Sequence, residues 1–289
     1  SLKKINTLIL GSAYPWSDTG GNNISDISPL AALSSLNKLW LDYNNISVLS
    51  PLSSLPQLSE LSLNSTNISS IGPLSSLINL STLSLTRNSI SDVSPLASLT
   101  KLNRLYLDNN TISDLTPLSS LTQLTTLLAN GNHIENVPPL ATLSNLSAVY
   151  LDVNNIQDVS PLSSLTTLSA LDIRWNMVAD LSPLGSLTKL TRLSLQYNKI
   201  NDLSPLSALI NLNELYLLNN NVSDLIPLSS LAHLRVLDLQ NNNVVDVSPL
   251  SGLTALTTLW LDGNQIVDVS PLSGFTSLMT LSLSRNRIV

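Results

Sequence analysis

Leucine and other aliphatic residues recur along this chain with a period of 22 residues. Segments that begin at Leu36, at Leu58 and so on to Leu278 align without insertion or deletion across twelve starts. With the first leucine as position 1, the unit reads LxxLxLxxNxIxDxSPLxxLxx. A degenerate first unit begins at Ile5, which gives about 13 strand segments in all. A fixed period of this length indicates a solenoid, in which each unit packs only on its neighbours.

The two halves of the unit predict different elements. Positions 1, 4 and 6 are apolar and end in the alternation of a short strand, as at Leu39 and Leu41. Position 16 is proline in all twelve units that reach it, from Pro29 to Pro271, and Ser or Thr precedes it in nine. Ser or Thr as an N-cap followed by Pro at N1 predicts a short 3-10 turn, with the leucines at positions 17 and 20 directed into the core.

Position 9 is asparagine in twelve of thirteen units, from Asn22 to Asn286, with Thr66 as the exception. A buried amide at this point can satisfy backbone groups where the chain leaves the sheet. Together with the leucines it completes the leucine-rich-repeat signature. We therefore predict an α/β repeat solenoid, a leucine-rich-repeat horseshoe with a parallel β-sheet on the concave face and short 3-10 turns on the convex face. The prediction is one domain over residues 1–289 with a truncated last repeat.

Aspartate occupies position 13 in nine of twelve units. An Asp two residues before Ser-Pro favours an Asx-turn onto its own backbone. The alternative is a ladder of carboxylates that binds cations, since successive coils lie within about 5 Å of one another. The nine residues are Asp26, Asp92, Asp114, Asp158, Asp180, Asp202, Asp224, Asp246 and Asp268.

The motif N-x-I-x-D-x-x-P-L-x-x-L occurs as NTISDLTPLSSL from Asn110 and as NKINDLSPLSAL from Asn198. In this motif the chain closely resembles the internalin-type bacterial leucine-rich-repeat family, over Ile5 to Val289. The resemblance implies a right-handed horseshoe and a surface or secreted protein that binds host or neighbouring-cell ligands through its concave face. Phosphatase-regulating repeats of eukaryotes share the period but usually lack the regular D-x-x-P-L, so they rank second.

Composition narrows the possible partners. The net charge is −6 and the pI about 4.7, which argues against nucleic acid as a partner because counterion release needs a basic face. No apolar run reaches the length of a membrane span, so no membrane insertion is expected. There is no cysteine, and His133 and His233 fall on different surfaces of the repeat. With no catalytic motif or cofactor motif, we expect neither an enzyme nor a cofactor.

Aromatic residues mark the candidate binding surface. Side chains at positions 3, 5, 7 and 8 should face the concave side, and eight of the ten Trp and Tyr residues sit at positions 5 and 8 only. They either cover neighbouring aliphatic stems or anchor an interface, and we favour anchors. Trp175 and Tyr197 should stack, Asp152 and Arg174 should pair, and Tyr106, Leu128 and Tyr150 should form an apolar run. The candidate ligand-binding residues are Trp40, Tyr43, Tyr106, Tyr150, Asp152, Arg174, Trp175, Tyr197, Tyr216 and Trp260.

The first unit carries an insertion, residues 11–21, with Gly at both ends and Tyr14 and Trp16 inside. It is either a lid over the first coil, which we favour, or a contact at the rim.

The predicted function is a non-catalytic binding or adhesion module for a protein or glycan, in a larger bacterial surface or secreted protein. Residues 1–10 already carry repeat leucines instead of a signal peptide. The alternatives are an intracellular scaffold or regulatory subunit of the phosphatase-regulator type, and a structural repeat arm of a larger enzyme. We expect a monomer or weak dimer.

Overall fold

The computed structural model describes residues 4–11 and 21–289. It divides into two compact units, Ser1–Leu146 and Ser147–Val289, which are described separately below. The prediction of a single domain over the whole chain stays a prediction. Tyr14 and Trp16 lie outside the described residues, so the lid and the rim contact both stay open for the insertion.

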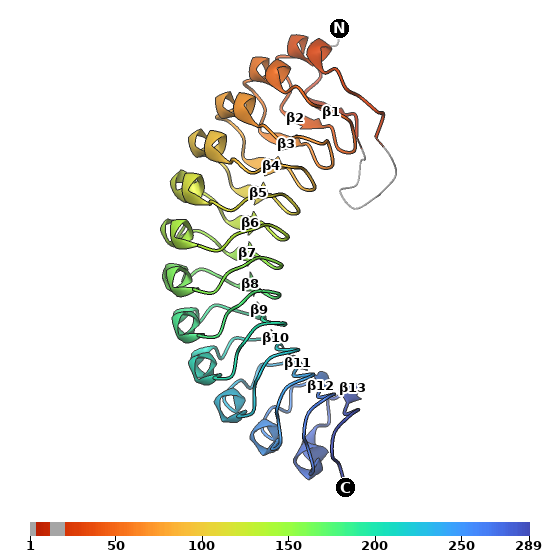
Figure 1. Ribbon diagram of the computed structural model, residues 1–289, viewed down its shortest axis with the longest axis vertical. Coiled ribbons are helices and arrows are strands. Elements are labelled where there is room, and N and C mark those ends of the chain that lie inside the picture. Colours follow the sequence, from red (N-terminus) through yellow and green to blue (C-terminus); the bar gives the residue numbers. More distant parts are fainter. Residues whose placement is uncertain (1–3, 12–20) are drawn as a thin grey trace. The chain divides into compact units, whose positions relative to one another are not determined.

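In the first unit, strands and 3-10 turns (η) alternate along the chain (Figure 1). The strands are β1 (Thr7–Ile9), β2 (Lys38–Trp40), β3 (Glu60–Ser62), β4 (Thr82–Ser84), β5 (Arg104–Tyr106) and β6 (Thr126–Leu128). The turns are η2 (Ser28–Ala32), η3 (Ser50–Ser54), η4 (Gly72–Ser76), η5 (Ser94–Ser98), η6 (Thr116–Ser120) and η7 (Pro138–Thr142).

The second unit repeats the same alternation. Its strands are β7 (Ala148–Tyr150), β8 (Ala170–Asp172), β9 (Arg192–Ser194), β10 (Glu214–Tyr216), β11 (Val236–Asp238), β12 (Thr258–Trp260) and β13 (Thr280–Ser282). Its turns are η8 (Ser160–Ser164), η9 (Ser182–Ser186), η10 (Ser204–Ala208), η11 (Ile226–Leu228), η12 (Ser248–Leu250) and η13 (Ser270–Gly274).

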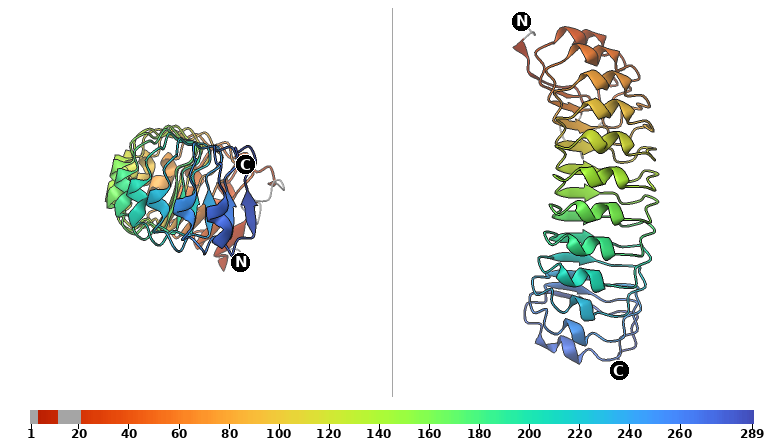
Figure 2. Two further views of the ribbon diagram at one scale, coloured as in Figure 1. Left: turned by 90° about the horizontal axis from the view of Figure 1, so that it is seen from below. Right: turned by 90° about the vertical axis from the view of Figure 1, so that its left-hand side faces the viewer.

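Strands within each unit are parallel, follow sequence order and pair in the 22-residue register. Leu39 pairs with Leu61, and Leu215 with Leu237. Within each unit the 3-10 turns are spread more widely than the strands, so the strand side is the concave side of that unit (Figure 1). The right-hand view of Figure 2 looks onto the opposite side, where the turns of successive coils follow one another. The predicted fold class is confirmed.

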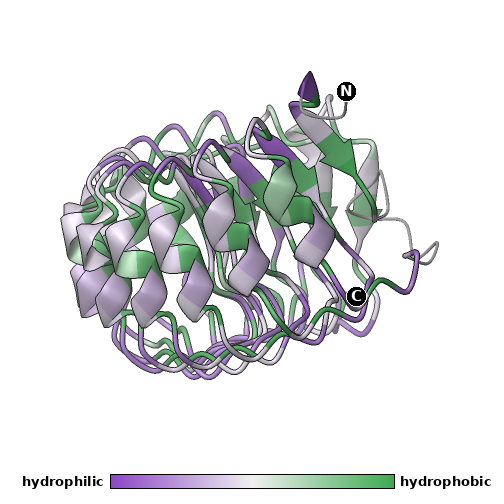
Figure 3. Cartoon of the chain, turned by 90° about the horizontal axis from the view of Figure 1, so that it is seen from above, coloured by the Kyte–Doolittle hydropathy of each residue, from purple (hydrophilic) through white to green (hydrophobic). Residues whose placement is uncertain are grey.

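The core is almost entirely aliphatic and continuous within each unit. The repeat leucines of the inner coils are fully buried, including the position-17 and position-20 residues Leu52 and Leu55, whereas Leu281 in the last coil is 43% exposed. Each turn carries both hydrophobic and hydrophilic residues (Figure 3), because its leucines face the core while its Ser residues face solvent. Each coil therefore buries its apolar side only by packing on the coils next to it.

The asparagine column forms a hydrogen-bonded ladder that ties each coil to the one before it. The Asn110 amide donates to the carbonyls of Leu107 and, one coil earlier, Leu85, at 3.0 Å each. Its Oδ1 accepts the Ile90 N–H at 3.0 Å. The predicted role is confirmed along both units, from Asn44 to Asn286.

The aspartate column caps the turns. In all nine units with Asp at position 13, Oδ1 accepts the N–H two residues later, as from Ser182 to Asp180 at 2.8 Å. The predicted Asx-turn is confirmed. Among residues 4–11 and 21–289, no group of three or more acidic or His side chains is arranged to hold a metal ion.

The predicted Ser or Thr N-cap is wrong. The residue before each proline is the first residue of the turn, its N-cap is apolar (Leu181 before η9, for example), and the cap side chain makes no hydrogen bond. The physical reason is that the Leu184 N–H, which a Ser182 cap would have to satisfy, already donates to the Leu181 carbonyl at 2.8 Å, while Asp180 accepts the N–H of Ser182 itself.

Candidate binding surface

Every residue at position 8 has a left-handed backbone. The φ angles are 53° at Trp175 and 55° at Tyr197, and equivalent positions in other coils hold Asn109, Asn241 and Gly263 with φ between 51° and 68°. Asn and Gly tolerate this conformation, whereas a bulky residue there costs about 1 kcal/mol. Trp175 and Tyr197 therefore stand at a position that disfavours bulky residues, as Arg87 and Val153 do in other coils.

Trp175 and Tyr197 stack face to face in the second unit. Their ring centroids are 3.6 Å apart with an interplanar angle of 10°, as the spacing of their coils predicts. The backbone N–H of Trp175 donates to the Gln196 carbonyl, and the backbone N–H of Tyr197 donates to the Leu218 carbonyl, both at 2.8 Å. Trp175 is nevertheless 52% exposed. The pair is a rigid aromatic surface, fixed by the backbone and open to solvent.

Two charged clusters lie on neighbouring strands. Arg174 Nε is 3.3 Å from Asp152 Oδ2, the predicted pair, and 3.5 Å from Asp172 Oδ2. One coil further on, Arg192 bridges Glu214 at 2.9 Å and lies over the Tyr216 ring at 5.4 Å. The Tyr216 hydroxyl donates to Glu214 at 2.9 Å.

Four carboxylates at positions 5 and 7, which were expected to face the concave side, are buried. Asp42, Asp172, Asp238 and Asp262 are 2–8% exposed. The reason is size: an aspartate carboxylate is short, and larger neighbours on adjacent strands cover it, as Tyr216 and Trp260 flank Asp238. For Asp238 the sequence signal was a small acid between two aromatic residues at the same repeat position, Tyr216 and Trp260.

Burial raises the pKa of each of these carboxyl groups, but hydrogen bonds reverse the net shift at one of them. Desolvation raises the pKa of Asp172, against the opposing charge of Arg174. It also raises the pKa of Asp42 and of Asp238. At Asp262 desolvation is outweighed by hydrogen bonds from Ser282 and Ser284, so its pKa is lowered.

Replacing Asp238 with asparagine should change how stability depends on pH. The folded pKa of Asp238 is raised by burial, with the nearby Asp262 charge adding to the effect and the Gln240 N–H opposing it. Its favourable contribution is present below the unfolded pKa and is lost as pH rises through the folded value. The stability of Asp238→Asn relative to the parent should therefore increase from pH 3.5 to pH 7 in thermal melts.

Asp180→Asn is the matched control with the opposite sign. Hydrogen bonds from Ser182 lower the Asp180 pKa, so its contribution is present above the unfolded pKa and is lost as pH falls. Parallel pH profiles for the two variants would contradict the assignment of Asp238 as a desolvated carboxylate.

The remaining predicted residues are spread over both units. In the first, Trp40 Nε1 donates to Glu60 at 2.9 Å, and Glu60 also bridges Lys38 at 2.8 Å. Tyr43 has a left-handed backbone, and Tyr106 pairs in register with Leu128. Tyr150 lies in the second unit, at the end of β7, and Trp260 ends β12. The structure thus joins Trp175 with Tyr197, joins Arg174 with Asp152 in the adjoining coils, and leaves the others spread over further coils.

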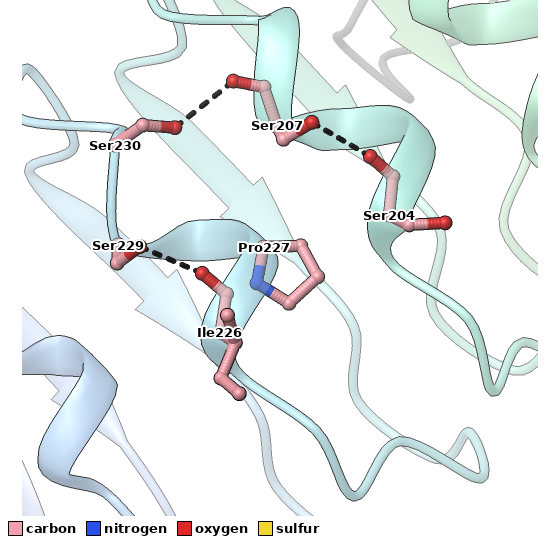
Figure 4. Close-up of a pocket in the computed structure, with 6 residues that line it drawn as sticks. All are labelled: Ser204, Ser207, Ile226, Pro227, Ser229 and Ser230. Carbon is pink, nitrogen blue, oxygen red and sulfur yellow. Dashed lines mark hydrogen bonds between the residues drawn. The ribbon is translucent and has the colours of Figure 1, made fainter.

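The turn side offers no comparable chemistry at its depression between η10 and η11 (Figure 4). The hydroxyls of Ser207 and Ser229 donate to carbonyls of their own turns, and that of Ser230 donates to the Ser207 carbonyl at 2.9 Å. These donors are already used by the protein, so we place the candidate site on the strand side.

Comparison with known proteins agrees with this architecture. A family model described as leucine-rich repeats in two copies matches residues 56–97, 78–120, 188–233, 210–252 and 232–274. The crystal structure of an internalin (InlF) of Listeria monocytogenes is similar to this chain with 37% identity and a TM-score of 0.95. The match covers 100% of this chain and 83% of the internalin chain. This chain belongs to the internalin family of leucine-rich-repeat proteins. The resemblance seen in the sequence is confirmed.

Two further structures are similar. Internalin C2 of Listeria monocytogenes shares 33% identity over 73% of this chain and 84% of its own, with a TM-score of 0.57. A leucine-rich-repeat protein of Leptospira interrogans shares 25% identity over 99% of this chain and 74% of its own, with a TM-score of 0.89. No curated protein sequence matches the chain. In the described residues of this internalin-family chain, no helix is both long and apolar enough to cross a bilayer.

Proposed function

We propose that this internalin-family chain is a non-catalytic binding module of a bacterial surface or secreted protein, and that its second unit binds a protein or glycan ligand on the strand side. The observation that carries the proposal is the Trp175 and Tyr197 pair. Exposed, rigid aromatic side chains are common anchors of interfaces. They occupy left-handed positions where Asn or Gly would be more stable, and unlike Arg87, Val153 and Arg285 at the same repeat position they form a stacked aromatic pair.

Surface or extracellular location is part of the proposal and is supported by the internalin relatives. These relatives favour it over an intracellular regulatory subunit of the phosphatase-regulator type. Two charged pairs in the same unit, Arg174 with Asp152 and Arg192 with Glu214, supply polar groups of the kind found at the rims of interfaces.

The double variant Trp175→Asn, Tyr197→Asn tests the proposal. Two relieved left-handed residues are worth about 2 kcal/mol, and the lost ring stack costs about 1 kcal/mol. The variant should therefore be at least as stable as the parent in urea unfolding. Its binding to mammalian epithelial cells and to a glycan array should fall by roughly 30-fold or more, as expected for two anchor residues.

Arg285→Asn is the matched control, because Arg285 occupies the same repeat position with φ of 55° and carries no ring. It should bind as the parent does. A double variant that is folded and retains full binding would refute the aromatic pair as the anchor.

A further inference from the structure

Acidic side chains on the strand side of the second unit differ in whether the protein supplies a cation for them. Asp172 has Arg174 at 3.5 Å, two residues further along its own coil. Glu214 has Arg192 at 2.9 Å. At Asp238 the residue two positions on is Gln240, and it contributes its backbone N–H, which donates to Asp238 Oδ1 at 3.1 Å.

Asp238 is thus a buried carboxylate with half of its acceptor capacity unused. It is 7% exposed, and in the described part of the chain its Oδ2 accepts no hydrogen bond and faces no Lys or Arg. Among the described residues, the one side-chain atom that is both fully buried and without a hydrogen-bond partner is Gln196 Oε1. Asp238 Oδ2 also lacks a partner, so it is not fully buried and keeps some contact with solvent. An unpaired buried charge is costly, and a cation that reaches it gains strongly.

The neighbours of Asp238 suit a cation. Tyr216 and Trp260 stand on either side of it in strand register, on β10 and β12 (Figure 1). At about 4.8 Å per strand, the backbones at Tyr216 and Trp260 are about 10 Å apart with Asp238 between them, so both aromatic side chains border the carboxylate. The faces of Trp and Tyr rings attract cations, and a guanidinium stacks on them.

The same unit already shows this chemistry within the chain. The Arg192 guanidinium lies over the Tyr216 ring while it bridges Glu214. One coil further on, the acid and the aromatic residues are present and the guanidinium is not.

We propose that Asp238, together with Tyr216 and Trp260, binds a cationic side chain of a protein ligand, and that this side chain is an arginine. This inference rests on the proposed function, because it assigns the chemistry of one contact on the same strand side. It also favours a protein ligand over a neutral glycan. Below, these three residues are called the Asp238 site.

The test uses a small probe in place of the ligand. N-acetyl-arginine methylamide is titrated into the whole chain, and the Trp260 indole N–H signal, assigned with Trp260→Phe, is followed by NMR. N-acetyl-citrulline methylamide has nearly the same shape without the charge. The arginine probe should shift the signal saturably and the citrulline probe should bind about tenfold more weakly or not at all.

Three variants sharpen the result. Asp238→Asn removes the charge at constant size and should weaken the arginine probe about tenfold. Gln240→Arg supplies the internal cation that Asp172 already has, so it should block the probe. Asp180→Asn makes the same charge change on the turn side and should leave binding unchanged. Equal binding of arginine and citrulline probes, or full binding to folded Asp238→Asn, would overturn the proposal.

A further titration distinguishes a protein cation from the ammonium group of an amino sugar. Methyl β-glucosaminide carries an ammonium group on a sugar, and it should bind more weakly than the arginine probe because it has no planar cation to stack. Tighter binding of the amino sugar would overturn the assignment to a protein side chain. If the Trp175 and Tyr197 variant loses cell binding but still binds the arginine probe, both proposals are supported. If the arginine probe does not bind the parent, the Asp238 site is overturned and the proposed function still stands.

Discussion

Replacing Asn242 with alanine should lower the free energy of unfolding by about 3 kcal/mol. Asn242 is 6% exposed, and its Oδ1 accepts the Val222 N–H at 2.9 Å. Its amide donates to Leu217 at 2.9 Å and to Leu239 at 3.1 Å. Both carbonyls also accept a bond from another Asn of the column, so they keep one partner. The Val222 N–H loses its acceptor, and that buried orphan donor supplies much of the cost.

Urea unfolding measures the total loss, and hydrogen exchange localises it. The Val222 amide should exchange much faster in the variant, whereas the Ile200 amide, held by Asn220 at 3.0 Å, should change less. Asn243→Ala is the control, because Asn243 is the exposed next residue. Unchanged protection of Val222 would show that the column does not hold the coils together.

The chain contains a natural departure from this column. Thr66 stands where the other units have Asn, and its hydroxyl donates to Leu63 at 2.7 Å. The threonine side chain is too short to accept a hydrogen bond from the backbone of the coil before it, as an Asn side chain does at this position. In the described residues, the Ile46 N–H, which corresponds to Val222, has no protein acceptor. One such gap is tolerated because each coil is held by several interactions with both neighbours.

Much of this fold could be predicted from the sequence because repetition turns local rules into columns. A single Asn or Asp carries little information, but Asp180 and its eight equivalents all meet the same geometry, so one Asx-turn predicts nine. The strand register follows from the same period, since paired residues are 22 apart, as Leu215 and Leu237 are. The stacking of Trp175 on Tyr197 needed only their shared column.

The site itself was less predictable, since it depends on neighbours of unequal size and on backbone angles. Position 5 was predicted to face solvent, yet Asp238 is covered because Tyr216 and Trp260 flank it, whereas Trp175 at position 8 is half exposed. Position 8 holds Asn or Gly in five of its twelve regular coils, so the sequence signals its left-handed backbone only weakly, and Trp175 and Tyr197 depart from that preference. These departures from the repeat average are the features that the proposals use.

Family membership and these departures answer different questions. The internalin relatives establish the family and the fold of the chain. Recognition of one ligand has to come from side chains that differ from coil to coil. In the second unit those are the Trp175 and Tyr197 pair and the Asp238 site, which lie on the same side of the sheet and can be tested by separate variants.

Replacing Leu237 with alanine should destabilise the protein by about 4 kcal/mol, within the range for a fully buried leucine. Leu237 is 0% exposed and lies in β11 between Leu215 and Leu259, so both neighbouring coils lose contacts to the cavity. Leu281 holds the same repeat position in β13 and is 43% exposed, so Leu281→Ala should cost about 1 kcal/mol or less. Urea and thermal unfolding of both variants measure the difference. Equal losses would show that stability does not depend on neighbours on both sides, contrary to a solenoid whose coils are stabilised by the coils next to them.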